Sequence, residues 1–176
     1  MFIKVNCSFI LHHFKVLIGC WVGNLKMGSE KQIILISESS KLSINFPHML
    51  AVKGMKIALL SIQSPDLTTS IGGREKRVPK DSYFVGDSLS VFVHCDKIKE
   101  NVYVTKIPSN SSIPIKCLDI VQLKLGMGYN TIEVQNPKYH ALNTESLFSL
   151  EIELCDMNGK AVKFDSGYIV IKLGLK

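Results

Sequence analysis

The residues His94, Cys95 and Asp96 are consecutive, and together they hold the side chains of a thiol nucleophile, a base and an orienting acid. A cysteine hydrolase needs its imidazole within hydrogen-bond reach of the thiol. These residues end a run with the alternation typical of a β-strand, on which neighbouring side chains point to opposite faces. We therefore expect a buried Cys95 thiol and an exposed His94 imidazole. A hydrolase that used Cys95 would require the fold to bring His94 or His140 to the thiol.

Two further groups of titratable residues have simple structural interpretations. Glu151 and Glu153 lie two positions apart, on one face of an expected strand. Paired carboxylates can carry out acid–base catalysis, but the wet face of a strand predicts the same pattern. His140 follows Tyr139 in an expected loop, where an exposed ring needs no function. We therefore assign no catalytic role to these residues.

The cysteines are spaced widely and irregularly, and no CxxC pair indicates a zinc ribbon. An odd number of cysteines within apolar patterns is typical of free thiols in a reducing compartment. Dinucleotide-binding, Walker, zinc-protease and serine-hydrolase motifs do not occur. The sequence therefore predicts no enzyme, no cofactor and no metal site, and it identifies no catalytic or binding residue. The five cysteines are Cys7, Cys20, Cys95, Cys117 and Cys155.

The first 26 residues differ in character from the rest, because they are apolar and basic and hold four candidate metal ligands. The ligand spacing matches no usual metal site, and the two histidines interrupt the apolar core that a signal peptide needs. Met27 and its polar successors are typical of a chain start. We expect residues 1–30 to be an extension or arm and residues 31–176 to form one domain. The candidate ligands are Cys7, His12, His13 and Cys20.

The elements that position these side chains are expected to be short strands. Val, Ile, Leu, Phe and Tyr gather in brief clusters separated by polar turns, and no helical period is strong. About eight antiparallel strands at such spacing indicate an all-β sandwich or barrel. Residues 66–86 and 108–114 are expected to be loops, and residues 156–159 a turn. The expected strands are 32–37, 41–46, 55–62, 89–95, 115–125, 130–135, 147–154 and 168–175, with a short edge piece at 101–104.

Two of these expected strands, residues 41–46 and residues 147–154, also predict the direction of their side chains. In both, every second residue is apolar and is expected to face the core, because a sheet with one wet face alternates with a period of two. Pro47 is expected to end the earlier run, since it cannot donate to a ladder. The predicted inward residues are Leu42, Ile44, Phe46, Phe148, Leu150, Ile152 and Leu154.

The chain is basic, with 21 Lys and Arg against 15 Asp and Glu and a formal charge of +6. Only Arg74 and Arg77 are arginines, and no cluster of arginines or stacking aromatics appears. Sequence-specific recognition of nucleic acid usually depends on such groups, so we do not predict it. No apolar run reaches 18 residues, so no membrane span is expected.

Several segments, in order along residues 31–175, resemble the minor capsid (penton) protein of Polinton/Maverick elements and the related adintoviruses. The more specific parts of the resemblance are the Asn-Pro-x-Tyr step and the Asp-x-x-Gly…Phe…Gly ending. The other parts are runs of alternating apolar residues. The segments are 56–62 with Pro65, 91–96, 135–139 and 149–156, followed by Gly159, Val162, Phe164, Gly167 and residues 169–173.

The resemblance implies a single jelly roll that forms pentamers at the vertices of an icosahedral shell, beside a double jelly-roll major capsid protein. It implies location in the virion and assembly inside the host cell. The basic excess would then suit an acidic neighbouring subunit or the genome side of the shell. The alternative is a ligand- or receptor-binding β-sandwich, such as a trimeric jelly roll or a carbohydrate-binding module.

Overall fold

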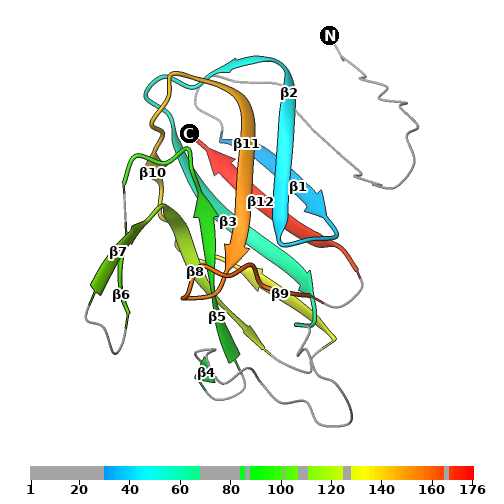
Figure 1. Ribbon diagram of the computed structural model, residues 1–176. Coiled ribbons are helices and arrows are strands. Elements are labelled where there is room, and N and C mark those ends of the chain that lie inside the picture. Colours follow the sequence, from blue (N-terminus) through cyan, green and yellow to red (C-terminus); the bar gives the residue numbers. More distant parts are fainter. Residues whose placement is uncertain are drawn as a thin grey trace.

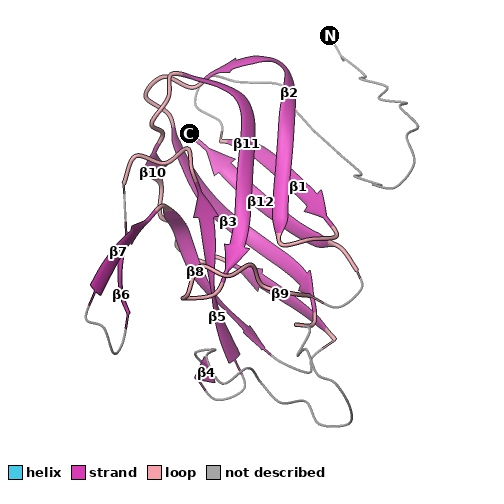
Figure 2. Ribbon diagram, viewed as in Figure 1, coloured by secondary structure: helices cyan, strands magenta, loops and turns pink. Residues whose placement is uncertain are grey.

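The computed structural model describes residues 30–67, 84–85, 88–100, 102–106, 111–124, 128–164 and 167–176. These residues form strands and connecting turns without a helix, which confirms the predicted all-β class (Figure 2). No apolar helix of membrane-spanning length occurs in these ranges. Residues 1–29 of the expected N-terminal arm, most of the 66–86 loop with its arginines, and residues 165–166 lie outside the described residues.

The strands pair antiparallel in two main sheets, which form two layers (Figure 1). The first sheet has the order β1-β12-β3-β9, and a short strand, β10, extends the β9 side of β3. Its central strand is β3, whose first seven residues, Lys56 to Ile62, are mostly apolar, as in a strand buried on both faces. The bounds are β1 Lys31–Ser37, β3 Lys56–Pro65, β9 Tyr129–Glu133, β10 His140–Ala141 and β12 Ile169–Leu175.

The second sheet has the order β2-β11-β5-β8, with the short strand β4 paired to the start of β5. A separate hairpin of β6 and β7 precedes β8 and projects from the side of the sandwich in Figure 1. The bounds are β2 Lys41–Ala51, β4 Phe84–Val85, β5 Ser88–Cys95, β6 Val102–Lys106, β7 Ser111–Ile115, β8 Cys117–Lys124 and β11 Ser146–Cys155. Residues 111–114, which were expected from the sequence to lie in a loop, belong instead to β7. Residues 108–110 of the expected loop lie outside the described residues.

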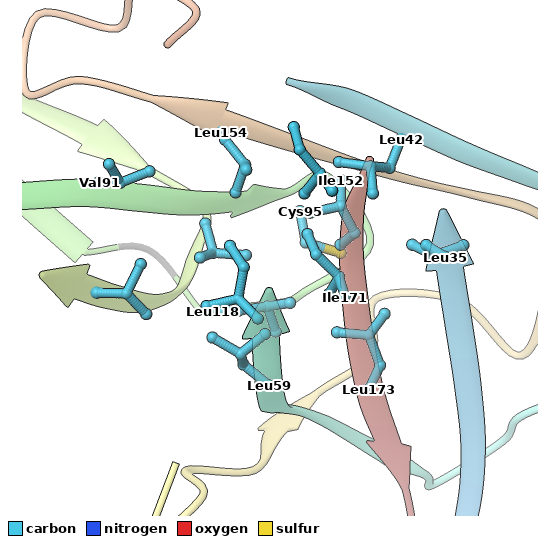
Figure 3. Packing of buried hydrophobic residues seen from close by; sticks show 14 of the residues in the cluster. Leu35, Leu42, Leu59, Val91, Cys95, Leu118, Ile152, Leu154, Ile171 and Leu173 are labelled. Atoms are coloured by element: carbon cyan, nitrogen blue, oxygen red, sulfur yellow. The ribbon is translucent and has the colours of Figure 1, made fainter. Parts of the chain in front are cut away.

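The core fills the space between the two sheets. Side chains such as Leu42 and Ile152 from one sheet meet Ile171 and Leu173 from the other (Figure 3). All four are fully buried. Burial of each such side chain contributes about 1.5–3 kcal/mol, so the apolar alternation supplies the main driving force for the two-layer structure.

A large bulge in β2 explains why two sequence predictions are wrong: the inward direction of Phe148 and the end of the strand at Pro47. Leu50 pairs with Leu147, but Asn45 pairs with Ser149, so four residues of β2 lie opposite the single residue Phe148. The shift turns Phe148 away from the core, so that the residue is 64% exposed, while Leu147 is buried in its place. The even-numbered residues after the bulge, from Leu150 to Leu154, are buried as predicted.

Pro47 does not end β2, which continues to Ala51. In the described chain β2 pairs only with β11, so it is an edge strand, and Pro47 falls inside the bulge. A proline is tolerated at both kinds of position because its missing N–H interrupts no ladder there. The end of the strand therefore could not be read from the proline alone.

Candidate functional site

The three described cysteines are free and buried, and their thiols are poor nucleophiles. Burial is the main cause that raises the pKa of Cys95, Cys117 and Cys155, in each case to about 11. A thiol with such a pKa carries almost no thiolate at neutral pH. Cys95 points into the core from β5, as expected.

His94 and Cys95 point to opposite faces of β5, so the adjacent pair does not form a couple. Cys95 is fully buried, and His94 is half-buried on the outer face, rather than fully exposed as predicted. The strand register instead aligns His94 with Glu153 of β11 on one side and with Cys117 of β8 on the other. Sequence reasoning missed this row, because nothing in the sequence states which strands are neighbours.

The row of Glu153, His94 and Cys117 has the residue types of a thiol–imidazole–carboxylate triad, but the Cys117 thiol is not activated. The Cys117 thiol donates a hydrogen bond to the Asp119 carbonyl oxygen at 2.9 Å and is 2% exposed. Its pKa is raised to about 11. An activated nucleophile requires the opposite, a lowered pKa and access to substrate.

The carboxylates of β11 lie on the solvated face of the second sheet. Glu151 forms an ion pair with Lys41 of β2, with 2.9 Å between the two charged groups, and about half of each side chain is exposed. The Glu151 partnership raises the pKa of Lys41. This arrangement is a cross-strand surface pair, as the alternation predicts.

His140 is 2% exposed, so the expectation of an exposed ring is wrong. Its Nδ1 lies 2.7 Å from the Glu100 carboxylate, and its Nε2 lies 3.0 Å from the Leu118 carbonyl oxygen. Each ring nitrogen faces an oxygen, so both hydrogen bonds to an ionised Glu100 and to the carbonyl form only when both nitrogens carry a proton. The ring joins β10 of the first sheet to β8 of the second.

Tyr139, the tyrosine of the Asn-Pro-x-Tyr step, contacts both Glu30 and Lys176, the first and last residues of the described domain. Its hydroxyl contacts the Glu30 carboxylate, and the Lys176 ammonium lies 3.5 Å from the centre of its ring. Both Tyr139 and Glu30 pack over Gly174, where any side chain would collide with them. Burial and then the Glu30 carboxylate raise the pKa of Tyr139 to about 12. We call Glu30, Tyr139 and Lys176 the Tyr139 clamp, because their contacts hold the two ends of the described domain together.

A shallow hollow of about 250 Å³ lies beside the exposed ring of Phe148. Met49, on the facing segment of the β2 bulge, is 58% exposed. Most of the other groups around the hollow are polar. The lining residues are Lys97, Asn143, Thr144, Ser146, Leu147, Phe148 and Ser149.

Within the described ranges, no three His, Cys, Asp or Glu side chains gather closely enough to hold a metal ion. A scan against protein-family models finds no match for this chain, and a search of the curated proteins finds none either.

Proposed function

We propose that the protein is a structural capsid subunit, a penton-type single jelly roll that assembles as a ring of five copies at the vertices of an icosahedral virion. A double jelly-roll major capsid protein is its neighbour in the shell. The observation that carries the proposal is the order in which the strands pair.

Four of the six pairings between long strands of the two sheets are nested, and the other two, β3 with β12 and β5 with β11, join the nested pairs into sheets. The first long strand pairs with the last, the second with the second last, and so on inward: β1 with β12, β2 with β11, β3 with β9, and β5 with β8. The first and third pairs lie in one sheet, and the second and fourth lie in the other. This nested order is the one expected of a jelly roll, the fold that the sequence resemblance implies, and it supports the proposal.

A fold alone does not establish a function, so the surface must also suit assembly. Phe148 and Met49 leave more than half of their side chains exposed on two neighbouring strands. Adjacent large apolar groups on a surface are typical of contacts with another molecule. We call Met49 and Phe148 the β2–β11 patch, and we assign it to the contact between copies. Closed rings of identical subunits use such repeated contacts.

Size-exclusion chromatography with multi-angle light scattering on the full chain tests the proposal. A stable species of five chains is expected, and electron microscopy should show it as a five-fold ring. A species that remains a monomer over the accessible range of concentration would contradict the proposal. A monomer that also binds oligosaccharides at the hollow beside Phe148 would favour the ligand-binding sandwich instead.

A further inference from the structure

One end of the sandwich carries most of the lysines that the structure describes. This end, which we call the basic end, consists of the turns 52–55, 96–100 and 134–145 with five residues that lie beside them: Glu30, Lys31, Lys56, Lys116 and Lys176. Backbone hydrogen bonds hold these segments together, from Lys99 to Ala141 and between Lys56 and Lys176 in both directions. Its eight lysines are Lys31, Lys53, Lys56, Lys97, Lys99, Lys116, Lys138 and Lys176.

The carboxylates of the basic end are fewer, and all have partners. Glu145 pairs with Lys53 at 3.2 Å, and Asp96 pairs with Lys97 at 2.9 Å. The other two are the partners of His140 and Tyr139 described above. The four carboxylates are Glu30, Asp96, Glu100 and Glu145.

Six lysines of the basic end therefore have no carboxylate partner within the described part of the chain. Lys116 donates to the Asp96 carbonyl oxygen at 3.0 Å, and Lys176 lies over the Tyr139 ring. Lys56, Lys99 and Lys138 are exposed. The opposite end is more evenly charged where it is described, with Glu38, Asp66 and Asp156 against Lys41, Lys124, Lys160 and Lys163.

We propose that the basic end binds the phosphate backbone of nucleic acid without regard to sequence, so that in the shell it faces the packaged genome. The inference rests on the proposed function for its biological meaning. Lysines without a carboxylate partner are point charges that attract phosphates, and contacts to phosphates carry no sequence information.

The composition of the basic end favours nucleic acid over an acidic protein. The centres of protein interfaces are apolar and poor in lysine. None of the described exposed large hydrophobic residues lies within the turns of the basic end, although Met49 and Phe148 lie in the adjoining ends of β2 and β11 and Phe148 lines the same hollow as Lys97. A polyanion needs no apolar anchor, since release of its counterions drives binding.

Fluorescence anisotropy of labelled duplex DNA, with the full chain at 50–200 mM salt, tests the proposal. Each lysine that contacts a phosphate contributes about 0.9 to the slope of log K against log salt. The variant K56Q/K99Q/K138Q should therefore lose about 2.7 from the slope, by the same relation. K124Q/K160Q/K163Q removes the same charge at the opposite end and should leave the slope unchanged. Duplexes of unrelated sequence should bind equally.

Four outcomes would overturn the proposal: no binding of DNA, equal losses in the two triple variants, tighter binding of polyglutamate than of DNA, or binding of anionic vesicles in preference to DNA. The three single substitutions, each expected to lower the slope by about 0.9, keep the test valid should the triple variant fold poorly. Light scattering separates this inference from the proposed function. A five-chain species whose salt slope is unchanged in K56Q/K99Q/K138Q would refute the inference alone. A monomer whose salt slope falls in that variant would refute the capsid proposal alone.

Discussion

Ser64 of β3 lies directly opposite Asn130 of β9, and the two buried polar side chains differ in their hydrogen bonding. The Asn130 amide accepts from the Lys124 N–H at 2.9 Å and donates to the Lys124 carbonyl at 3.0 Å. It thereby ties the end of β8 to β9 across the two sheets. The Ser64 hydroxyl is fully buried and has no hydrogen-bond partner within the described chain.

Replacement of these two residues should have opposite effects on stability. Ser64→Ala removes an unpaired buried hydroxyl and should leave the free energy of unfolding unchanged or raise it by up to about 1 kcal/mol. Asn130→Ala leaves both backbone groups of Lys124 without partners and should lower it by about 1–3 kcal/mol. Urea unfolding followed by circular dichroism measures both. A clear loss of stability in Ser64→Ala would mean that the hydroxyl has a partner.

His140 should be a stabilising residue of the domain. His140→Ala removes both hydrogen bonds, leaves the Leu118 carbonyl unpaired in a buried position and opens a cavity. The expected loss is about 2–4 kcal/mol in the free energy of unfolding. Glu100→Gln is the matched control, because Glu100 is 56% exposed and its loss of charge should cost below about 1 kcal/mol. Equal losses in the two variants would show that the ion pair, rather than the buried ring, carries the effect.

The described thiols should be unreactive in the folded protein. In the background Cys7→Ser/Cys20→Ser, the three remaining cysteines should react with iodoacetamide at pH 8 far more slowly than in guanidinium chloride, because burial raises each pKa to about 11. Ser39→Cys, at an exposed turn, provides a reactive control. His94→Ala should leave the rates unchanged. Rapid modification of Cys117 that depends on His94 would instead indicate an active thiol–imidazole pair.

The side-chain alternation was sufficient to predict the eight long strands and the main core, because each depends on neighbours in sequence. It placed β5 and β12 within one residue of their observed bounds. It failed at Phe148, where a bulge in another strand sets the direction of the side chain. It also failed at His140, whose burial depends on Leu118 and Glu100, residues 22 and 40 positions away. Such contacts follow from strand order, which local patterns do not contain.

The Tyr139 clamp should make stability depend on pH in the alkaline range. The folded state raises the pKa of Tyr139 to about 12, from about 10 in an unfolded chain. A raised pKa means that the contribution is complete below about pH 10 and is lost as pH rises toward about 12. The wild type should therefore lose more stability across this window than Tyr139→Phe. Glu30→Gln should lose less stability across this window than the wild type, because it removes the carboxylate charge that helps to raise the pKa of Tyr139. Tyr139 itself stays buried in this variant, so part of the effect should remain. Parallel curves for the wild type and Tyr139→Phe would contradict the prediction.

The β2–β11 patch should be necessary for assembly and dispensable for folding. Phe148→Ser and Met49→Ser remove apolar surface that the isolated subunit exposes, so the free energy of unfolding of the monomer should change by less than about 0.5 kcal/mol. The five-chain species should nevertheless dissociate at higher concentration, as measured by light scattering on a dilution series. Ile120→Ser is the matched control, because Ile120 is 45% exposed on β8, two strands away from β11. An equal loss of assembly in Ile120→Ser would assign the contact to the outer face of the second sheet instead, and unchanged assembly in all three variants would exclude the patch.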